Sequence, residues 1–225
     1  MVAALYDVHG NLAALEAVLE DAERAGAEGY VLGGDYAVFG GWPAETVARL
    51  RELETALWIR GNGDRWLVDD HDAPDRAQGA IAACREVLGD ELSAELAALP
   101  GEVRHEGFRV CHASPPSDMR SFLPEPQDDE AELLEGVTEP RLLFGHTHLP
   151  FRRVAQGIEL INPGSVGLPF DGDDRASYAL LHPDGRVEHR RVVYNRAAAM
   201  DQVREQFGDA PWTAWAVERL ATARA

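Results

Sequence analysis

Short apolar segments alternate with amphipathic stretches along the first third of the chain. Residues 2–6, 30–32 and 57–59 are apolar and have the length of buried strands, and a glycine-containing turn follows each of them. The first two turns lead into segments whose apolar side chains recur at helical spacing. Strands that alternate with helices form parallel sheets through βαβ crossovers, so this pattern predicts an α/β fold.

The remainder of the chain changes from this pattern to short strands joined by tight turns. We expect antiparallel hairpins at the turns Glu106-Gly107, Gln156-Gly157 and Asp184-Gly185, because each pair lies between two β-type segments. The expected strands are residues 102–105, 108–111, 141–144, 151–154, 158–161, 178–181 and 187–193.

Two helical regions accompany these strands. Residues 65–99 have a polar helical pattern that Pro74 and Gly89 interrupt, and we interpret them as a helical insertion or lid. Residues 197–225 form a helical tail in which we expect Trp212 and Trp215 to cover the sheet. The proline-rich stretch between residues 114 and 139 is predicted to be a loop with one short helix near residues 131–134. No repeat or linker divides the chain, so residues 1–225 are predicted to form one domain.

The charge of the chain excludes several classes of function. The 225 residues carry a net charge of −18 at pH 7, and all 21 cationic residues are arginine. Without lysine there is no Walker-A phosphate lysine, no Schiff base and no protein-kinase lysine. A net negative charge also repels the phosphate backbone, so we expect no binding to duplex nucleic acid.

Cysteine usage and hydropathy bear on the location of the protein. Cys84 and Cys111 are too few for a disulfide framework and fit a reducing compartment. No stretch approaches the ~20 apolar residues of a membrane span. We therefore expect a cytoplasmic protein that does not bind membranes, and the sequence leaves open whether it forms a homo-oligomer.

Side chains that can bind a metal follow the expected strands at the point where each strand ends. The carboxyl ends of neighbouring strands in an α/β sheet meet at one crevice, so we expect these side chains to converge there. They are Asp7, His9, Asp35, Asn62, His112, His146 and His148.

The chemistry of this set favours a dinuclear centre. Two carboxylates, four imidazoles and one amide oxygen exceed the needs of a single tetrahedral site and suit two divalent cations that share a carboxylate. Asp35 is the expected bridge. Nitrogen and oxygen donors without a thiolate fit Mn, Fe, Zn or Ni, of which we favour Mn, and argue against Cu(I) or an iron–sulfur cluster.

The short motifs that contain these residues occur in the same order as in the calcineurin-like metallophosphoesterase superfamily. The chain resembles this superfamily, and more specifically its small prokaryotic phosphodiesterase branch. The resemblance extends from residue 1 to about residue 193. It implies a two-sheet αββα sandwich with mixed sheets and a helical insertion. The motifs are Asp7-Val8-His9-Gly10-Asn11, Gly34-Asp35, Gly61-Asn62, His112, Gly145-His146-Thr147-His148 and Asn162-Pro163-Gly164-Ser165.

The same resemblance implies a division of the ligands and a reaction. One metal would take Asp7, His9, Asp35 and His148, and the other would take Asp35, Asn62, His112 and His146. A hydroxide that bridges the two metals would attack the phosphorus of a small phosphoester. Small phosphodiesters, with cyclic nucleotides among the candidates, are the expected substrates.

The residue after the Gly61-Asn62 pair departs from the family pattern. The superfamily commonly has a histidine there that acts on the leaving oxygen, whereas this chain has Gly63 followed by Asp64. The missing imidazole favours diesters over monoesters. Asn62 and Asp64 are the catalytic candidates, with helix capping as the alternative role of Asp64.

Two arginines are candidates for contacts to the substrate phosphate. Arg65 and Arg120 carry guanidinium groups that could bind phosphate oxygens, or they could simply be solvated on the surface. Two alternative functions stay open at this point. The first is a phosphomonoesterase or protein phosphatase on the same fold, and the second is an interaction scaffold without enzymatic activity.

Overall fold

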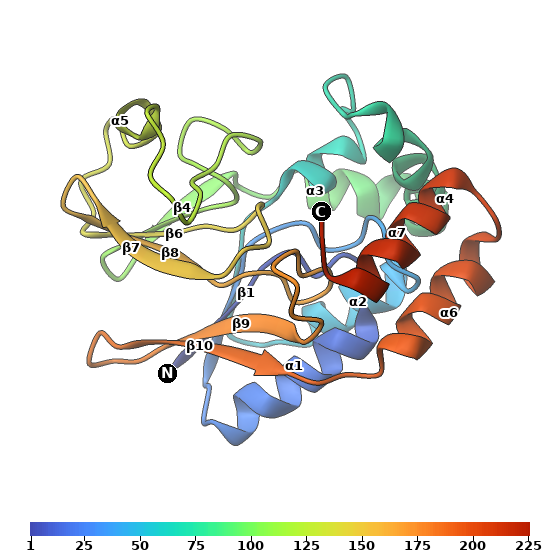
Figure 1. Ribbon diagram of the computed structural model, residues 1–225, viewed down its shortest axis with the longest axis horizontal. Coiled ribbons are helices and arrows are strands. Elements are labelled where there is room, and N and C mark those ends of the chain that lie inside the picture. The colour runs from blue at the N-terminus through green and yellow to red at the C-terminus, as the bar shows by residue number, and fades with distance from the viewer.

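A five-stranded mixed sheet contains the N-terminal strand at its centre, with the order β10-β9-β1-β2-β3. The computed structural model describes residues 1–225 (Figure 1). β1, β2 and β3 are parallel, as the alternating pattern predicts, and β9 pairs antiparallel with β1. The strands are β1 (Val2–Leu5), β2 (Gly29–Leu32), β3 (Ala56–Trp58), β9 (Ala176–Leu181) and β10 (Val187–Val192).

A second five-stranded sheet has the order β4-β5-β6-β8-β7. β5, β6 and β8 run parallel, and the outer strands β4 and β7 pair antiparallel with β5 and β8. The three predicted hairpins are confirmed at β4–β5, β7–β8 and β9–β10. The strands are β4 (Glu102–His105), β5 (Phe108–Cys111), β6 (Arg141–Leu143), β7 (Phe151–Ala155) and β8 (Ile158–Asn162).

Seven helices surround the sheets, and most of them lie against the first one (Figure 1). The sequence of α1 illustrates why a helix forms at this position. Asn11 caps the helix by accepting a hydrogen bond from the Ala14 amide, and the buried face holds Leu15, Val18 and Leu19. The helices are α1 (Leu12–Arg24), α2 (Pro43–Arg51), α3 (Asn62–Trp66), α4 (Asp75–Ala97), α5 (Glu130–Leu133), α6 (Arg196–Phe207) and α7 (Pro211–Thr222).

The core consists of three clusters of buried apolar side chains. Apolar side chains of both sheets pack face to face in the centre, including Val31, Leu143 and Ile161. A larger cluster joins the helices to the outer face of the first sheet, and a third cluster lies under α5 on the second sheet. The predicted αββα sandwich with mixed sheets is therefore confirmed.

Tyr6 lies between the two sheets at the end of β1. Its side chain is fully buried, and its hydroxyl donates a hydrogen bond to the Leu143 carbonyl oxygen of the second sheet at 3.2 Å. A Cβ atom at residue 33 would lie 2.0 Å from the Tyr6 ring, so only glycine fits beside it. This contact fixes the two strand ends next to each other at the edge where the candidate ligands lie.

The helical insertion differs in detail from the expectation. α3 begins at Asn62, three residues before the predicted start at residue 65, because the polar segment after β3 turns directly into a helix. α4 begins after Pro74 and is kinked at Gly89, where φ is 74°. No helix combines the length and the apolar character that crossing a bilayer requires.

Candidate metal centre

The seven predicted ligands come together at one edge of the sandwich. Asp7 and His9 follow β1, Asp35 follows β2 and Asn62 follows β3, all on the first sheet. His112 follows β5, and His146 and His148 follow β6, on the second sheet. Ligand atoms of two trios lie within 4.8 Å of one another. The trios are Asp7, His9 and His148, and Asp7, Asp35 and His112.

Five of these residues have a left-handed backbone, which non-glycine residues rarely adopt. Their φ angles lie between 49° and 68°. Each such residue costs about 1–3 kcal/mol and persists only where the surroundings enforce it. The sequence motifs do not indicate this left-handed backbone. It turns each side chain away from the direction of the preceding strand and toward the candidate metal centre. The five residues are Asp7, His9, Asp35, His146 and His148.

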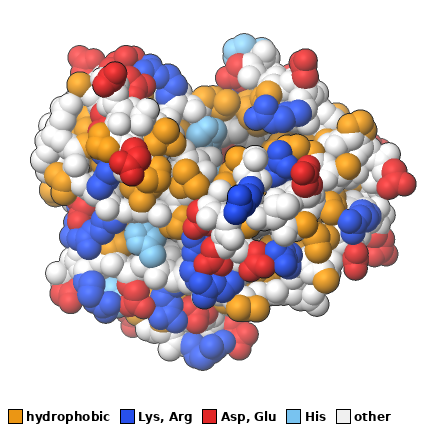
Figure 2. All heavy atoms as spheres, in the orientation of Figure 1, with side chains coloured by type: hydrophobic (Ala, Val, Ile, Leu, Met, Phe, Trp, Pro, Cys, Tyr) orange, Lys and Arg blue, Asp and Glu red, His pale blue; other side chains and the backbone are white.

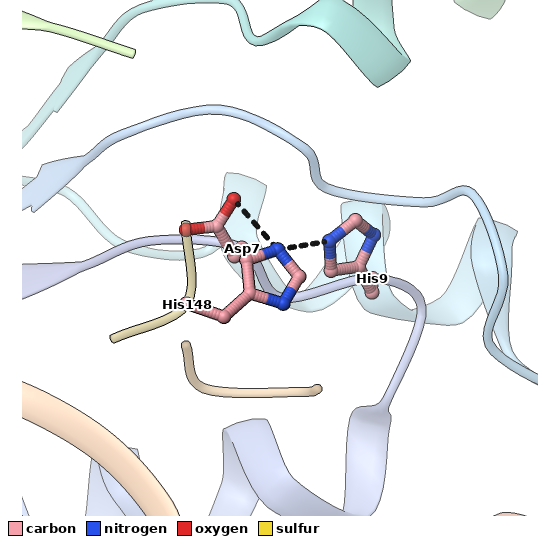
Figure 3. Close-up of side chains that lie close together, drawn as sticks. All are labelled: Asp7, His9 and His148. Carbon is pink, nitrogen blue, oxygen red and sulfur yellow. Dashed lines mark hydrogen bonds and ion pairs between the residues drawn. The ribbon is translucent and has the colours of Figure 1, made fainter. Parts of the chain in front are cut away.

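Hydrogen bonds to backbone carbonyls fix the tautomer of two facing neutral imidazoles. His9 Nδ1 lies 2.9 Å from the Val38 carbonyl oxygen, and His148 Nδ1 bonds to the Leu168 carbonyl oxygen, so both Nδ1 atoms carry the proton. The two Nε2 atoms therefore present lone pairs and face each other at 3.1 Å (Figure 3). Two lone pairs at this distance repel each other, and a proton or a metal cation that both nitrogens contact would relieve this repulsion.

Asp7 adds a carboxylate oxygen to the same point. Its Oδ1 atom is buried and has no hydrogen-bond partner. It lies 3.4 Å from His148 Nε2 (Figure 3). The other oxygen, Oδ2, accepts a hydrogen bond from the His146 amide at 3.1 Å. An unpaired buried carboxylate oxygen is costly, and a bound cation would remove that cost.

A second group of donors lies beside the first. The Asn62 side-chain oxygen lies 2.9 Å from His112 Nε2 and 2.8 Å from His146 Nδ1. His112 Nδ1 donates to the Gly33 carbonyl oxygen at 2.8 Å, which leaves Nε2 free to act as a ligand. Metal binding requires this orientation of the Asn62 amide, because the reverse orientation would turn its NH₂ group toward the same nitrogens.

Asp35 lies between the two groups. Its Oδ2 atom is 3.8 Å from His9 Nε2, and its Oδ1 atom is 3.7 Å from His112 Nε2. The Gly63 amide donates a hydrogen bond to Oδ1 at 2.6 Å. The side chain thus reaches both sets of donors, as the bridging role of Asp35 requires.

The charge states of these groups suit a metal centre. Burial lowers the pKa of His9 and of His146 to about 3, so both imidazoles are neutral ligands at neutral pH. Burial raises the pKa of Asp35 to about 7, and the negative charges of Asp64 and Asp7 add to this effect. For Asp7 the opposite holds, because the positive charge that His148 and the other neighbouring histidines carry when protonated outweighs burial and keeps the pKa of Asp7 below its usual range. A dication at this point would favour the ionised carboxylates further.

The Asp64 carboxylate points toward backbone amides. It is fully buried, and it accepts hydrogen bonds from Asp35 N and Gly61 N at 2.8 Å and from Tyr36 N at 3.1 Å. Asp64 is the third residue of α3, and its bond to the amide of the N-cap residue Gly61 is the half of a capping box that a glycine N-cap allows. These contacts favour the capping interpretation, and proton donation by Asp64 stays a prediction.

Both predicted substrate-binding arginines are held in ion pairs. Arg65 binds Asp118 at 2.7 Å and Asp72 at 2.9 Å, on the wall of a polar pocket of about 520 Å³ that also includes His112. Arg120 pairs with Asp129 and Glu132 and is not among the residues that line either pocket beside the centre. These pairs could not be predicted from sequence patterns, since the partners of Arg65 and Arg120 lie up to 53 residues away. Phosphate binding by either arginine stays a prediction.

A second pocket, of about 380 Å³, opens directly over the ligands. His9, Asp35, Asn62, His146 and His148 form its base. Figure 2 shows a hollow between the two halves of this face, with a histidine side chain visible inside it.

Both tryptophans of the helical tail pack with the large apolar cluster that joins the helices to the first sheet. Trp215 also lines the pocket over the candidate ligands. Covering of the sheet by these two side chains stays a prediction.

The fold and the ligand set define a class of protein, and the comparisons agree with it. The model of the calcineurin-like phosphoesterase superfamily domain matches residues 1–186. The chain belongs to this superfamily.

Similar proteins include two solved structures and one curated relative. A metallophosphoesterase from Sphaerobacter thermophilus is 31% identical with a TM-score of 0.83, and 99% of each chain is covered. The protein PH1004 from Pyrococcus horikoshii OT3 has a TM-score of 0.86 at 22% identity, with both chains fully covered, and shows the same fold. Phosphodiesterase YfcE of Escherichia coli K12 is 28% identical over 79% of this chain and 85% of its own.

Proposed function

We propose that this protein is a phosphodiesterase that depends on two divalent metal ions and hydrolyses small phosphodiesters. The observation that carries the proposal is the convergence of unprotonated donors: His9 Nε2 and His148 Nε2 lie 3.1 Å apart beside the unpaired Asp7 Oδ1. Metal cations among these donors would relieve the repulsion between the lone pairs and satisfy the unpaired carboxylate oxygen. The superfamily and the name of YfcE support the reaction class.

The ligands divide into two sets with Asp35 between them. Asp7, His9 and His148 would hold one metal, and Asn62, His112 and His146 the other, with Asp35 shared by both. Bound there, two dications would neutralise phosphate charge and promote ionisation of a water molecule near neutral pH. We favour Mn²⁺ because all donors are nitrogen or oxygen.

The protein itself contributes orientation. Backbone carbonyls hold three of the imidazoles with Nε2 toward the centre, and the left-handed backbone at Asp7 and Asp35 aims the carboxylates. No side chain at Gly63 can protonate the leaving oxygen, which favours diesters whose leaving group needs little protonation. A reducing cytoplasmic location fits the two buried free cysteines.

The test compares two generic substrates with and without added metal. We expect metal-dependent hydrolysis of bis-p-nitrophenyl phosphate that exceeds hydrolysis of p-nitrophenyl phosphate. The control variant Arg24→Gln changes an exposed side chain on α1 that pairs only with Glu20. Faster monoester hydrolysis would instead support the phosphomonoesterase alternative. A folded protein without metal-dependent hydrolysis of either substrate would support the other alternative, an interaction scaffold without enzymatic activity.

A further inference from the structure

Three aromatic side chains form a wall beside the His9 and His148 half of the centre. The Phe170 ring stacks on His148 with ring centres 4.3 Å apart and an angle of 22° between the planes. Phe39 lies 5.7 Å from His9 and 5.1 Å from Trp215, measured between ring centres. All three rings line the pocket of about 380 Å³. The aromatic surface therefore continues from the metal ligands into the cavity.

Arg219 lines the same cavity and offers hydrogen-bond donors there. Its guanidinium lies over the Trp215 ring, 5.1 Å from the ring centre. Glu218 pairs with Nη1 at 3.1 Å, whereas Nη2 takes part in no hydrogen bond or ion pair. A ligand in the pocket that brings an acceptor can therefore pair with this guanidinium.

A second arginine lies at the exposed edge of the cavity. Arg76, near the start of α4, lines the pocket and takes part in no ion pair or side-chain hydrogen bond, unlike most arginines of this chain. Its positive charge can attract an anionic substrate toward a protein whose net charge is −18.

These features together select one chemical class of ligand. An aliphatic group would make poor use of the aromatic wall, and a plain hydrocarbon ring would offer no acceptor to the Arg219 guanidinium. A nucleobase has both a flat π-face and ring nitrogen or carbonyl acceptors. We propose, resting on the phosphodiesterase function above, that this pocket binds the base of a nucleoside phosphoester while the phosphate lies at the metal centre.

The helices α4 and α7 contribute residues to one side of this pocket. Trp215 and Arg219 lie on α7, one turn apart, and Arg76 lies on α4. α4 and α7 contact each other and meet over the carboxyl ends of the strands (Figure 1). The insertion and the tail thus form the specificity-determining side of the site.

The experiment measures binding of two ligands that differ only in the base. Isothermal titration calorimetry of the full chain with Mn²⁺ is carried out with adenosine 5′-monophosphate and with ribose 5-phosphate. We expect the nucleotide to bind about tenfold more tightly or better, in the range of base–aromatic stacking. In Trp215→Leu and in Phe170→Leu, which change different segments, this ratio should fall toward one.

Arg219→Gln should weaken nucleotide binding more than sugar phosphate binding. Arg204→Gln on α6, whose side chain is exposed and pairs only with Asp201, is the matched control and should preserve the ratio. Thermal unfolding of each variant establishes that it is folded, and either aromatic variant suffices for the test.

Failure of this inference is distinguishable from failure of the phosphodiesterase proposal. Equal affinities for the two ligands, in a protein that hydrolyses bis-p-nitrophenyl phosphate with Mn²⁺, would overturn the base-binding pocket alone. A ratio that survives both aromatic substitutions would overturn it as well. Absence of metal-dependent hydrolysis would overturn the phosphodiesterase function instead.

Discussion

The Asp64 carboxylate holds the backbone of Asp35, with 2.8 Å between Asp64 Oδ2 and the Asp35 amide nitrogen. The same oxygen binds the Gly61 amide, so one buried side chain joins the loops after β2 and β3. Asp35 lies in the left-handed region, with φ at 58°, and needs such support to direct its carboxylate toward both sets of ligands.

Asp64→Asn should therefore weaken metal binding. We expect about a 10- to 100-fold loss of Mn²⁺ affinity, as for other groups that orient metal ligands, with activity largely restored at saturating Mn²⁺. Metal titrations monitored by hydrolysis of bis-p-nitrophenyl phosphate measure this. If activity stays low at saturating metal, and lower still for poor leaving groups, Asp64 acts as the proton donor.

Gly63→His should shift activity toward monoesters. The residue adjoins Asn62, and an imidazole there would supply the leaving-group acid that this chain lacks. A Cβ atom at residue 63 would lie 3.0 Å from Asp35 Oδ1, so some rearrangement accompanies the substitution. Gly63→Ala separates this crowding from the effect of the imidazole. We expect the monoester to diester ratio of kcat/KM to rise in the histidine variant only, and an unchanged ratio would contradict the role assigned to this position.

A charged cluster away from the centre should make stability depend on pH. Burial alone would raise the pKa of Asp21, but hydrogen bonds from Arg190 at 3.0 Å and Tyr178 at 2.8 Å outweigh it and lower the pKa. A carboxylate whose pKa is lower in the folded state stabilises the protein above the unfolded value of about 3.9, and this contribution is lost as the pH falls through the folded pKa.

Asp21→Asn should accordingly lower the free energy of unfolding at neutral pH by up to about 1 kcal/mol. Urea denaturation at several pH values measures the difference between wild type and variant, which should shrink as the pH approaches ~3. Asp201→Asn, which removes an exposed partner of Arg204, is the control. A difference that stays constant down to acid pH would exclude the assigned role of the Asp21 charge.

Added Mn²⁺ should stabilise the folded protein, because it relieves the repulsion between His9 Nε2 and His148 Nε2 and satisfies Asp7 Oδ1. At about 100 times the dissociation constant, one bound ion adds ~2.7 kcal/mol to the free energy of unfolding. Thermal unfolding with and without Mn²⁺ checks this as a rise in Tm. Asp7→Asn should reduce the rise, and an equal rise in both proteins would place the bound metal elsewhere.

Much of the fold could be predicted from local sequence, because its elements are locally encoded. Buried strands such as β1 and β2 are short apolar runs, and the hairpin turns have glycine where a positive φ is required, as at Gly107 and Gly157. The strand orders could not be predicted by the same means. They depend on pairings across the chain, such as β1 with β9, for which no local signal exists.

The convergence of the candidate ligands was predictable because each follows a strand, whereas the residues that support and surround them were not. Asp64 has the local signature of a helix cap, and its bond to Asp35 depends on the packing of a neighbouring loop. The ion pair of Arg65 with Asp118 and the turn of Trp215 into the pocket are likewise set by tertiary contacts. Side chains that act through distant segments leave no periodic pattern in the sequence.

The most direct test of the account is the metal content of the purified chain after equilibration with Mn²⁺ and removal of free metal. Elemental analysis should find about two ions per wild-type chain, and Asp35→Ala, which removes the shared carboxylate, should retain fewer than one and lose metal-dependent hydrolysis. A wild-type chain that retains no metal, or an Asp35→Ala variant that binds and hydrolyses as wild type does, would contradict it.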